Sequence, residues 1–156
     1  MPILFGRSRN SEDVDIIIEK LTFKQFDELW GELGKDFECI ITGDPKEAYD
    51  DYLSAKHSVR FSIKKQFIPN MEMKFPKNDL DVWTLEKKWR VFMNGRRLFI
   101  SPMELQIPFK LFLGSEKDIE DAKYLYLLFK GKLDKKLLWS FITKLKVEKS
   151  FKRYLR

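Results

Sequence analysis

Hydrophobic residues recur along this chain with two different periods, and each period predicts one kind of element. Between residues 58 and 63 and between 71 and 75, apolar and polar residues alternate, which is typical of a strand with one buried face. Between 22 and 33 and between 133 and 147, apolar residues recur every three or four positions, which is typical of a helix packed on a core. Because the two patterns are interleaved, the sequence predicts an α/β (α+β) fold, in which a mixed β-sheet with helices is followed by a helical C-terminal part.

Short local signals predict where several of these elements begin and end. Thr22 and Gln25 have the spacing of a capping box at a helix start, and Gly34 ends that helix. Asn94-Gly95 favours the tight turn of a hairpin, and Ser101 to Glu104 combines an N-cap, a first-turn proline and a capping glutamate. The other predicted segments are strands at 13–19, 37–42, 90–93 and 97–100 and helices at 45–55, 80–88, 103–113 and from 115 onward.

The segment from Met103 to Leu113 is apolar on almost all sides, which predicts a buried helix. Pro108 removes one backbone donor inside it, so we expect a bend. Lys110 is its only basic residue, and an unpaired ammonium group in such a place would be costly. Lys110 is therefore expected either to reach solvent along its aliphatic stem or to meet a negative ligand.

Positive charge is concentrated at the C-terminal end of the chain. Residues 130 to 156 contain ten Lys and Arg against two Asp and Glu, whereas the whole chain has a net charge of only +6. Such a segment could attract nucleic acid, or it could be a Lys-rich helix that simply faces solvent. Phe151, Tyr154 and Leu155 indicate that the tail docks on the domain or on a partner.

Composition narrows the class of protein. A chain of 156 residues that is 44% hydrophobic has room for one domain with a substantial core. With a single Cys39 and a single His57, neither an internal disulfide nor a Cys/His zinc site can form, so any metal must be held by oxygen. No apolar run is long enough for a bilayer span and no signal peptide is recognisable, so we expect a cytoplasmic protein that does not bind membranes.

Asp13 and Asp15 are the strongest candidates for chemistry. They precede the apolar run from Ile16 to Ile18, and on an extended backbone residues two apart point to the same side. Two carboxylates so placed can converge on hard divalent cations. Most such pairs in proteins are merely solvated carboxylates at a strand edge, and that alternative stays open. Just upstream, Arg7 and Ser11 are groups beside which a phosphate could sit.

The segment from Gly6 to Ile18 resembles the active-site strand of the DNA polymerase β-like nucleotidyltransferase superfamily, and is most similar to its small archaeal and bacterial minimal and abortive-infection types. The resemblance implies that Asp13 and Asp15 bind Mg²⁺ or Mn²⁺ and a nucleoside triphosphate. It also implies that Gly6, Arg7 and Ser11 belong to the nucleotide-binding turn. A third carboxylate comes from a later strand in this family, and Glu72 fits that position. The alternative is an ordinary solvent-facing glutamate.

A second match to the same family follows later in the chain. Lys110 and then Lys117-Asp118-x-x-Asp121 resemble a lysine and acidic motif on paired helices of the abortive-infection type. The resemblance implies that Lys110 lies near the triphosphate, in the cleft of the carboxylates, and that Lys117, Asp118 and Asp121 shape the nucleotide site. From the residues alone, Asp118 is equally well explained as a helix cap.

These observations predict one domain, with a nucleotidyltransferase-like sheet core at 1–100 and a helical part at 101–156. The predicted activity transfers a nucleotidyl group from a nucleoside triphosphate to a hydroxyl of an RNA, such as a tRNA-like molecule, or of a protein. A toxin–antitoxin partner and a homodimer are both compatible with it. The alternative is a non-catalytic module that binds RNA or a partner protein, because the family's first motif, a Gly-Gly or Gly-Ser pair, is not found before Asp13.

Overall fold

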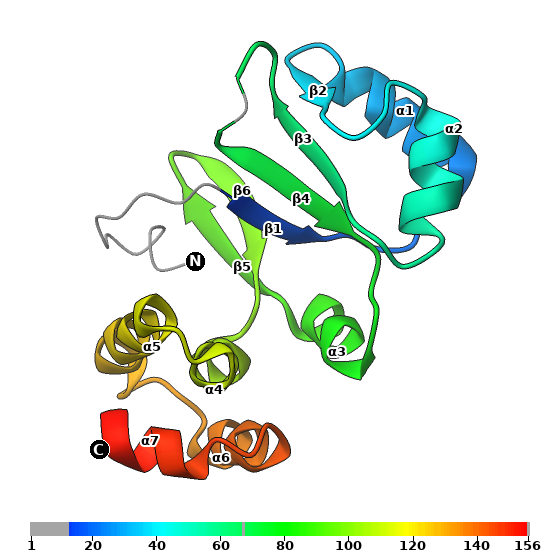
Figure 1. The fold of residues 1–156 in the computed structure, drawn as a ribbon. Coiled ribbons are helices and arrows are strands. Elements are labelled where there is room, and N and C mark those ends of the chain that lie inside the picture. Colours follow the sequence, from blue (N-terminus) through cyan, green and yellow to red (C-terminus); the bar gives the residue numbers. More distant parts are fainter. Residues whose placement is uncertain (1–12, 67, 156) are drawn as a thin grey trace. The chain divides into compact units, whose positions relative to one another are not determined.

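The computed structural model describes residues 13–66 and 68–155, and it divides into two compact units (Figure 1). The first unit, called here the sheet unit, ends at Glu86, and the second, called the helical unit, begins at Lys87. In chain order the sheet unit contains β1 (Asp13–Ile17), α1 (Phe23–Leu33), β2 (Phe37–Cys39), α2 (Pro45–Glu47), the π-helical η2 (Ala48–Leu53), β3 (Val59–Ile63), β4 (Asn70–Lys74) and α3 (Asp79–Lys87). The helical unit contains β5 (Trp89–Met93), β6 (Arg96–Ile100), α4 (Met103–Leu113), α5 (Glu116–Phe129), α6 (Lys135–Lys144) and α7 (Glu148–Tyr154).

The sheet unit is built on a mixed four-stranded sheet with the strand order β1-β4-β3-β2. β1 runs parallel to β4, and the other neighbouring strands are antiparallel. Val59, Phe61, Met73 and Phe75 of the period-two segments face α1 and η2, and the helices cover one side of the sheet (Figure 1). The buried side chains of this core are Phe26, Ala48, Leu53, Val59, Phe61, Met73 and Phe75. The α+β fold class predicted from the sequence is confirmed.

Two elements of the sheet unit differ from their predicted form. β2 ends at Cys39 instead of Thr42, because the Thr42 hydroxyl serves the next helix start: it donates to Glu47 and accepts from the Asp44 N–H. The second helix begins at Pro45 as expected but continues as a π-helix from Ala48. The capping box of Thr22 and Gln25 is present as predicted.

The helical unit begins with the predicted hairpin of β5 and β6. Asn94 and Gly95 both have positive φ values, 50° and 73°, as the tight two-residue turn requires. Apolar residues of the hairpin join those of the helices in one core. Its buried members are Ile100, Met103, Ile107, Leu111, Ala122, Leu125, Leu133, Leu138, Ile142, Val147 and Phe151. No helix in the described part of the chain combines the length and the apolar character that a membrane crossing requires.

α4 differs from the helix that its composition predicts in two ways. It is not buried on all sides, because Phe109, Phe112 and Leu113 are exposed near its C-terminal end. It begins at Met103 with Pro102 in the cap position, so Ser101 is not its N-cap. Glu104 does not close a capping box either. It is 3% exposed, and its Oε1 accepts a hydrogen bond of 3.0 Å from the backbone N–H of Asp134.

The C-terminal segment forms the helix predicted at 133–147, as α6, and a further helix, α7, in the tail, where no helix was predicted. The break between the two helices lies at Lys146, which adopts a positive φ of 56°. Because this residue is not a glycine, its type does not predict a break at this position. After the break, α7 returns its Phe151 to the core of the helical unit, where Phe151 packs edge to face on Tyr126 and Trp139. The prediction that the tail docks on the domain is confirmed.

The contact between Glu104 and Asp134 gives a stability prediction. Replacing Glu104 with Ala removes the buried oxygen that accepts the hydrogen bond from the Asp134 N–H at the start of α6. We therefore expect a loss of about 1–3 kcal/mol in the free energy of unfolding. Glu104→Gln keeps an acceptor oxygen of the same reach and should lose clearly less. Urea unfolding followed by circular dichroism measures both variants, and equal losses would contradict the role given to this hydrogen bond.

Candidate functional site

The polar face of the sheet, opposite the helices α1 and α2, carries the predicted carboxylates. Residues that lie directly across from each other in neighbouring strands share a face of the sheet. The register places Asp15 opposite Glu72 and Glu72 opposite Arg60. It also places Asp13, Asn70, Ser62 and Glu38 in one neighbouring row across all four strands. Asp13, Asp15 and Glu72 are therefore on one face of two adjacent strands, as the alternation in the sequence predicts.

Asp13 is held in place by the strand beside it. Asn70 donates a hydrogen bond of 2.6 Å from its Nδ2 to Asp13 Oδ1. Asn70 is buried, and its Oδ1 accepts no hydrogen bond from any described residue. The Oγ of the buried Ser62, on the next strand, likewise has no hydrogen-bond partner among the described residues. Asp13 and Asp15 themselves are exposed, because β1 is an edge strand of this sheet. The face therefore combines accessible carboxylates with buried oxygens of unused hydrogen-bonding capacity.

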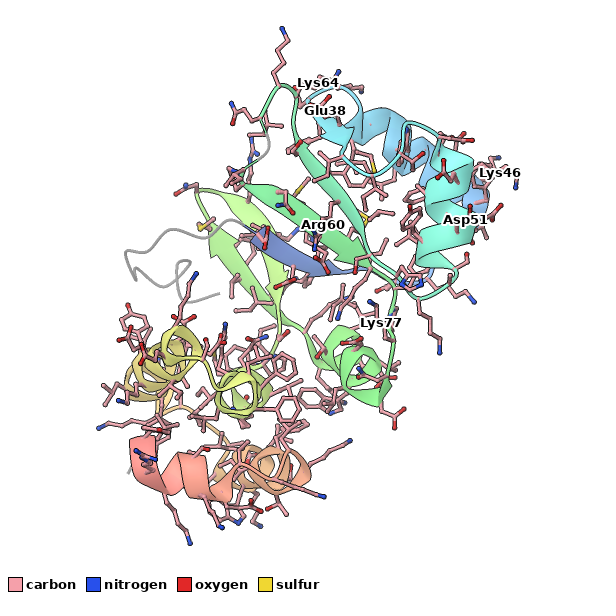
Figure 2. The ribbon with its side chains drawn as sticks, viewed as in Figure 1. Glu38, Lys46, Asp51, Arg60, Lys64 and Lys77 are labelled. Carbon is pink, nitrogen blue, oxygen red and sulfur yellow. The ribbon has the colours of Figure 1, made fainter. Side chains whose placement is uncertain are left out.

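Glu72 has a counterion that the sequence analysis did not identify. The guanidinium of Arg60, labelled in Figure 2, donates to Glu72 Oε2 from Nε at 3.1 Å and from Nη2 at 2.9 Å. The alternation of residues 58–63 places Arg60 on the polar face, and this pattern is the only sequence signal that pointed to Arg60 as a neighbour of the carboxylates. Which residue it meets depends on the pairing of β3 with β4, which local sequence does not reveal.

The environment of Glu72 keeps it ionised. Burial of the carboxyl group raises its pKa, but hydrogen bonds from Ser58 and Arg60 and the positive charges of Arg60 and Lys77 lower it more, and the resulting pKa is below the ordinary value of 4.5. Glu72 is therefore an anion at neutral pH.

Metal binding by this face stays a prediction. Within residues 13–66 and 68–155, no group of three or more His, Cys, Asp or Glu side chains is gathered closely enough to hold a metal ion. Asp13, Asp15 and Glu72 share a face, but Glu72 is engaged by Arg60 and Asp13 by Asn70. Gly6, Arg7 and Ser11, the predicted nucleotide-binding turn, lie outside the described residues.

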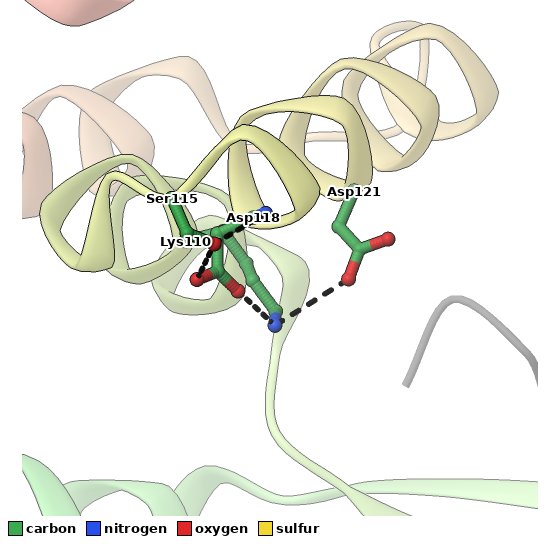
Figure 3. Close-up of polar contacts among 4 residues, drawn as sticks. All are labelled: Lys110, Ser115, Asp118 and Asp121. Carbon is green, nitrogen blue, oxygen red and sulfur yellow. Dashed lines mark hydrogen bonds and ion pairs between the residues drawn. The ribbon is translucent and has the colours of Figure 1, made fainter. Parts of the chain in front are cut away.

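The second predicted motif comes together within the helical unit (Figure 3). Gly114 ends α4 with a φ of 73°, and Ser115 starts α5 by accepting a hydrogen bond from the Asp118 N–H, so the two helices follow each other closely. This turn brings Lys110 Nζ to 2.6 Å from Asp118 Oδ1 and to 3.4 Å from Asp121 Oδ2. Lys110 therefore neither extends into solvent nor lacks a partner: its ion pairs are with the acidic residues of its own motif.

The members of this motif have different surroundings. Asp121 is completely buried and the side chain of Lys110 is 16% exposed, so the charges of this pair are largely screened from water. Asp118 also accepts a hydrogen bond from the Ser115 hydroxyl, but the residue whose side chain caps α5 is Ser115. Lys117 is exposed. A nucleotide-binding role for Lys110, Lys117, Asp118 and Asp121 stays a prediction.

Comparison with known proteins supports the fold. No protein-family model and no curated protein matches the sequence. The crystal structure of an antigenic nucleotidyltransferase-like protein from Paracoccidioides brasiliensis is similar, with a TM-score of 0.52 at 17% sequence identity, and the match covers 98% of this chain and 78% of that chain. At this level of identity the similarity shows the fold alone. The chain thus has a nucleotidyltransferase-like fold.

The lowered pKa of Glu72 predicts how stability depends on pH. A carboxylate whose pKa is lower in the folded protein than in the unfolded chain stabilises the fold above its ordinary pKa, and this contribution is lost as the pH falls through the folded-state value. Below about pH 4.5, the unfolding free energy of the wild type should therefore fall more steeply than that of Glu72→Gln. Urea titrations at a series of pH values test this, and parallel curves would contradict it.

The buried Lys110 pairs predict a second stability effect. In Lys110→Met, the fully buried Asp121 loses its ion pair with Lys110, so we expect a loss of about 3 kcal/mol in the free energy of unfolding. Lys117→Met is the matched control, since Lys117 is an exposed lysine of the same motif and its removal should change stability by less than about 0.5 kcal/mol. Similar effects in the two variants would contradict a structural role for the Lys110 charge.

Proposed function

We propose that this chain is a nucleotidyltransferase whose polar sheet face carries the reaction. The observation that supports this most directly is the placement of Asp13, Asp15 and Glu72 on one face of the adjacent parallel strands β1 and β4. The nucleotidyltransferase-like fold supports the same class of reaction. No Ser–His or Cys–His pair competes with this assignment, because the only His, His57, stands in no sequence context suited to one.

In the proposed reaction, a hydroxyl oxygen of the acceptor attacks the α-phosphorus of a nucleoside triphosphate. The new bond joins that oxygen to the α-phosphorus, the bond between the α-phosphorus and the bridging oxygen to the β-phosphorus breaks, and pyrophosphate leaves. The hydroxyl proton passes to a carboxylate. Glu72 is ionised at neutral pH and so can accept a proton, while the exposed Asp15 lies directly across the strand pair from it.

The donors on this face are oxygens, the ligands that a hard divalent cation such as Mg²⁺ or Mn²⁺ prefers. To bind one, the three carboxylates would have to come closer together than they lie among the described residues. Asp13, Asp15 and Glu72 would hold it, and the buried Asn70 Oδ1, which accepts no hydrogen bond from the described residues, is a further oxygen in the same row as Asp13. Such a cation would supply charge neutralisation to the triphosphate and the leaving pyrophosphate. Arg60 has to share Glu72 with it, so its pairing with Glu72 must loosen when the cation binds.

The acceptor in this proposal is a hydroxyl of an RNA or a protein, and a toxin–antitoxin pair is the biological setting that the sequence resemblance implies. A second candidate function is supported by a specific observation. Arg60 already neutralises Glu72, one of the three candidate carboxylates, and this pairing reduces the attraction of Glu72 for an added cation. On this alternative the chain uses the same fold to bind RNA or a partner protein without catalysis.

A labelling experiment separates the two functions. Wild-type protein is incubated with Mg²⁺ or Mn²⁺, with each of the nucleoside triphosphates labelled at the α-phosphate, and with bulk tRNA or cellular protein as acceptor. We expect label on one class of acceptor. We also expect a decrease of at least about a hundredfold when Asp13→Asn and Asp15→Asn are combined, since these carboxylates would hold the charge-neutralising cation.

Glu38→Gln is the matched control, because Glu38 lies on the same face but on β2, at the opposite edge of the sheet from β1. Calorimetry with Mn²⁺ on the same three proteins measures cation binding independently of the acceptor. Mn²⁺ binding and labelling that are equal in the wild type and the double variant would refute the proposed site and favour the non-catalytic function.

A further inference from the structure

The β5–β6 hairpin of the helical unit has an unusual solvent face. Trp89, Val91 and Ile100 pack toward the core of the unit, and Leu98 lies on the same face, opposite Val91. The opposite face of an exposed hairpin is ordinarily polar. Here that face carries Phe92, which is 68% exposed, and Phe99, which is 57% exposed. The strand register places Arg97 opposite Phe92 and Arg90 opposite Phe99, so aromatic and cationic side chains alternate across it.

The charge of this face has one sign. Residues 87–100 contain five Lys and Arg and no Asp or Glu. Neither Arg90 nor Arg97 forms an ion pair with any described acidic residue. The Arg90 guanidinium instead lies 5.9 Å from the centre of the Phe92 ring, and Lys88 Nζ lies 5.3 Å from the centre of the Phe99 ring. These cations restrict the two rings while leaving more than half of each ring's surface exposed.

Cross-strand pairing alone does not account for this composition. Cation–aromatic pairs do stabilise hairpins, but a pair of Thr or a pair of opposite charges would serve equally well without exposing two large apolar rings. The rings are diagonal neighbours on adjacent strands, roughly 7–8 Å apart at their backbones, so they form two neighbouring platforms. A ligand suited to this face must have flat apolar faces and regularly spaced negative charges.

We propose that the exposed face of the β5–β6 hairpin binds single-stranded nucleic acid. Unpaired bases stack on Phe92 and Phe99, and Arg90 and Arg97 contact the phosphates that link them. In a duplex the base faces are hidden, so its phosphates can contact the arginines but its bases cannot stack on the two rings. This inference does not depend on nucleotidyl transfer, because it rests on residues of the helical unit alone.

Fluorescence anisotropy with labelled oligo(U), oligo(dT) and a duplex of the same length tests the proposal on the full chain. Combining Phe92→Thr with Phe99→Thr keeps residues that favour strands. It should weaken binding of the single strands by at least about tenfold, with an unchanged salt dependence. Combining Arg90→Gln with Arg97→Gln should instead reduce the slope of log affinity against log salt by about 1.4, since each phosphate contact of a single strand contributes about 0.7. The RNA and DNA strands together show whether the sugar is recognised.

Matched controls remove the same kind of side chain elsewhere. Phe112→Gln removes a ring that is 57% exposed on α4, and Lys20→Gln with Lys24→Gln removes two exposed charges from the sheet unit. Both should bind as the wild type does. Circular dichroism and melting temperature verify that the hairpin variants are folded.

Three outcomes would overturn the proposal. The first is that folded Phe92→Thr/Phe99→Thr protein binds single strands as tightly as the wild type. The second is that duplex and single strand bind equally and both are insensitive to the two rings. The third is that binding is lost in Lys135→Gln with Lys136→Gln on α6 but unchanged in all hairpin variants, which would assign nucleic-acid binding to the basic tail.

Discussion

The parallel pairing of β1 with β4 is the constraint on which the polar face of the sheet depends. The side chains of a strand alternate strictly between its two faces, so a shift of one residue in this pairing would place Val14, not Asp15, beside Glu72. The apolar residues fix the register: Met71 and Met73 must face α1 and α2. Burial on one side of the sheet thereby aligns the carboxylates on the other side, although these groups of like charge repel each other.

That alignment has an electrostatic cost, and the protein meets it with its own cation. Asp15 and Glu72 are anions on neighbouring strands, and Arg60 comes from the third strand to pair with Glu72. The same interaction that stabilises the face competes with any added cation for Glu72. In a functional site on this face, an added cation therefore has to replace Arg60 as the partner of Glu72. The Arg60–Glu72 pair that stabilises the fold thus lowers the affinity for a metal ion.

Sequence patterns predicted those features that depend on one segment at a time. The period-two pattern placed Asp13 and Asp15 on one side of their strand and Glu72 on the polar side of its own, and the Asn94-Gly95 turn and the Thr22 cap followed from local backbone preferences. Features that depend on two segments were missed. Arg60 meets Glu72 only through strand pairing, and Glu104 serves the start of a helix thirty residues away. The helix α7 was missed for another reason: its Phe151 packs in the tertiary core of the unit, and it follows Lys146, whose positive φ is not a conformation that lysine prefers.

The regions of this molecule differ in whether their cationic side chains are paired with carboxylates. Arg60 and Lys110 are each matched to carboxylates that the fold brings to them, so their charges are used up in stabilising their own units. Arg90 and Arg97 have no such partner among the described residues and lie beside exposed rings. A cation that the fold leaves unmatched retains its full attraction for a charged ligand, whereas one already paired must first give up its partner. Nucleic acid should therefore bind at the hairpin more readily than beside Arg60 or Lys110, whose charges are already paired with carboxylates.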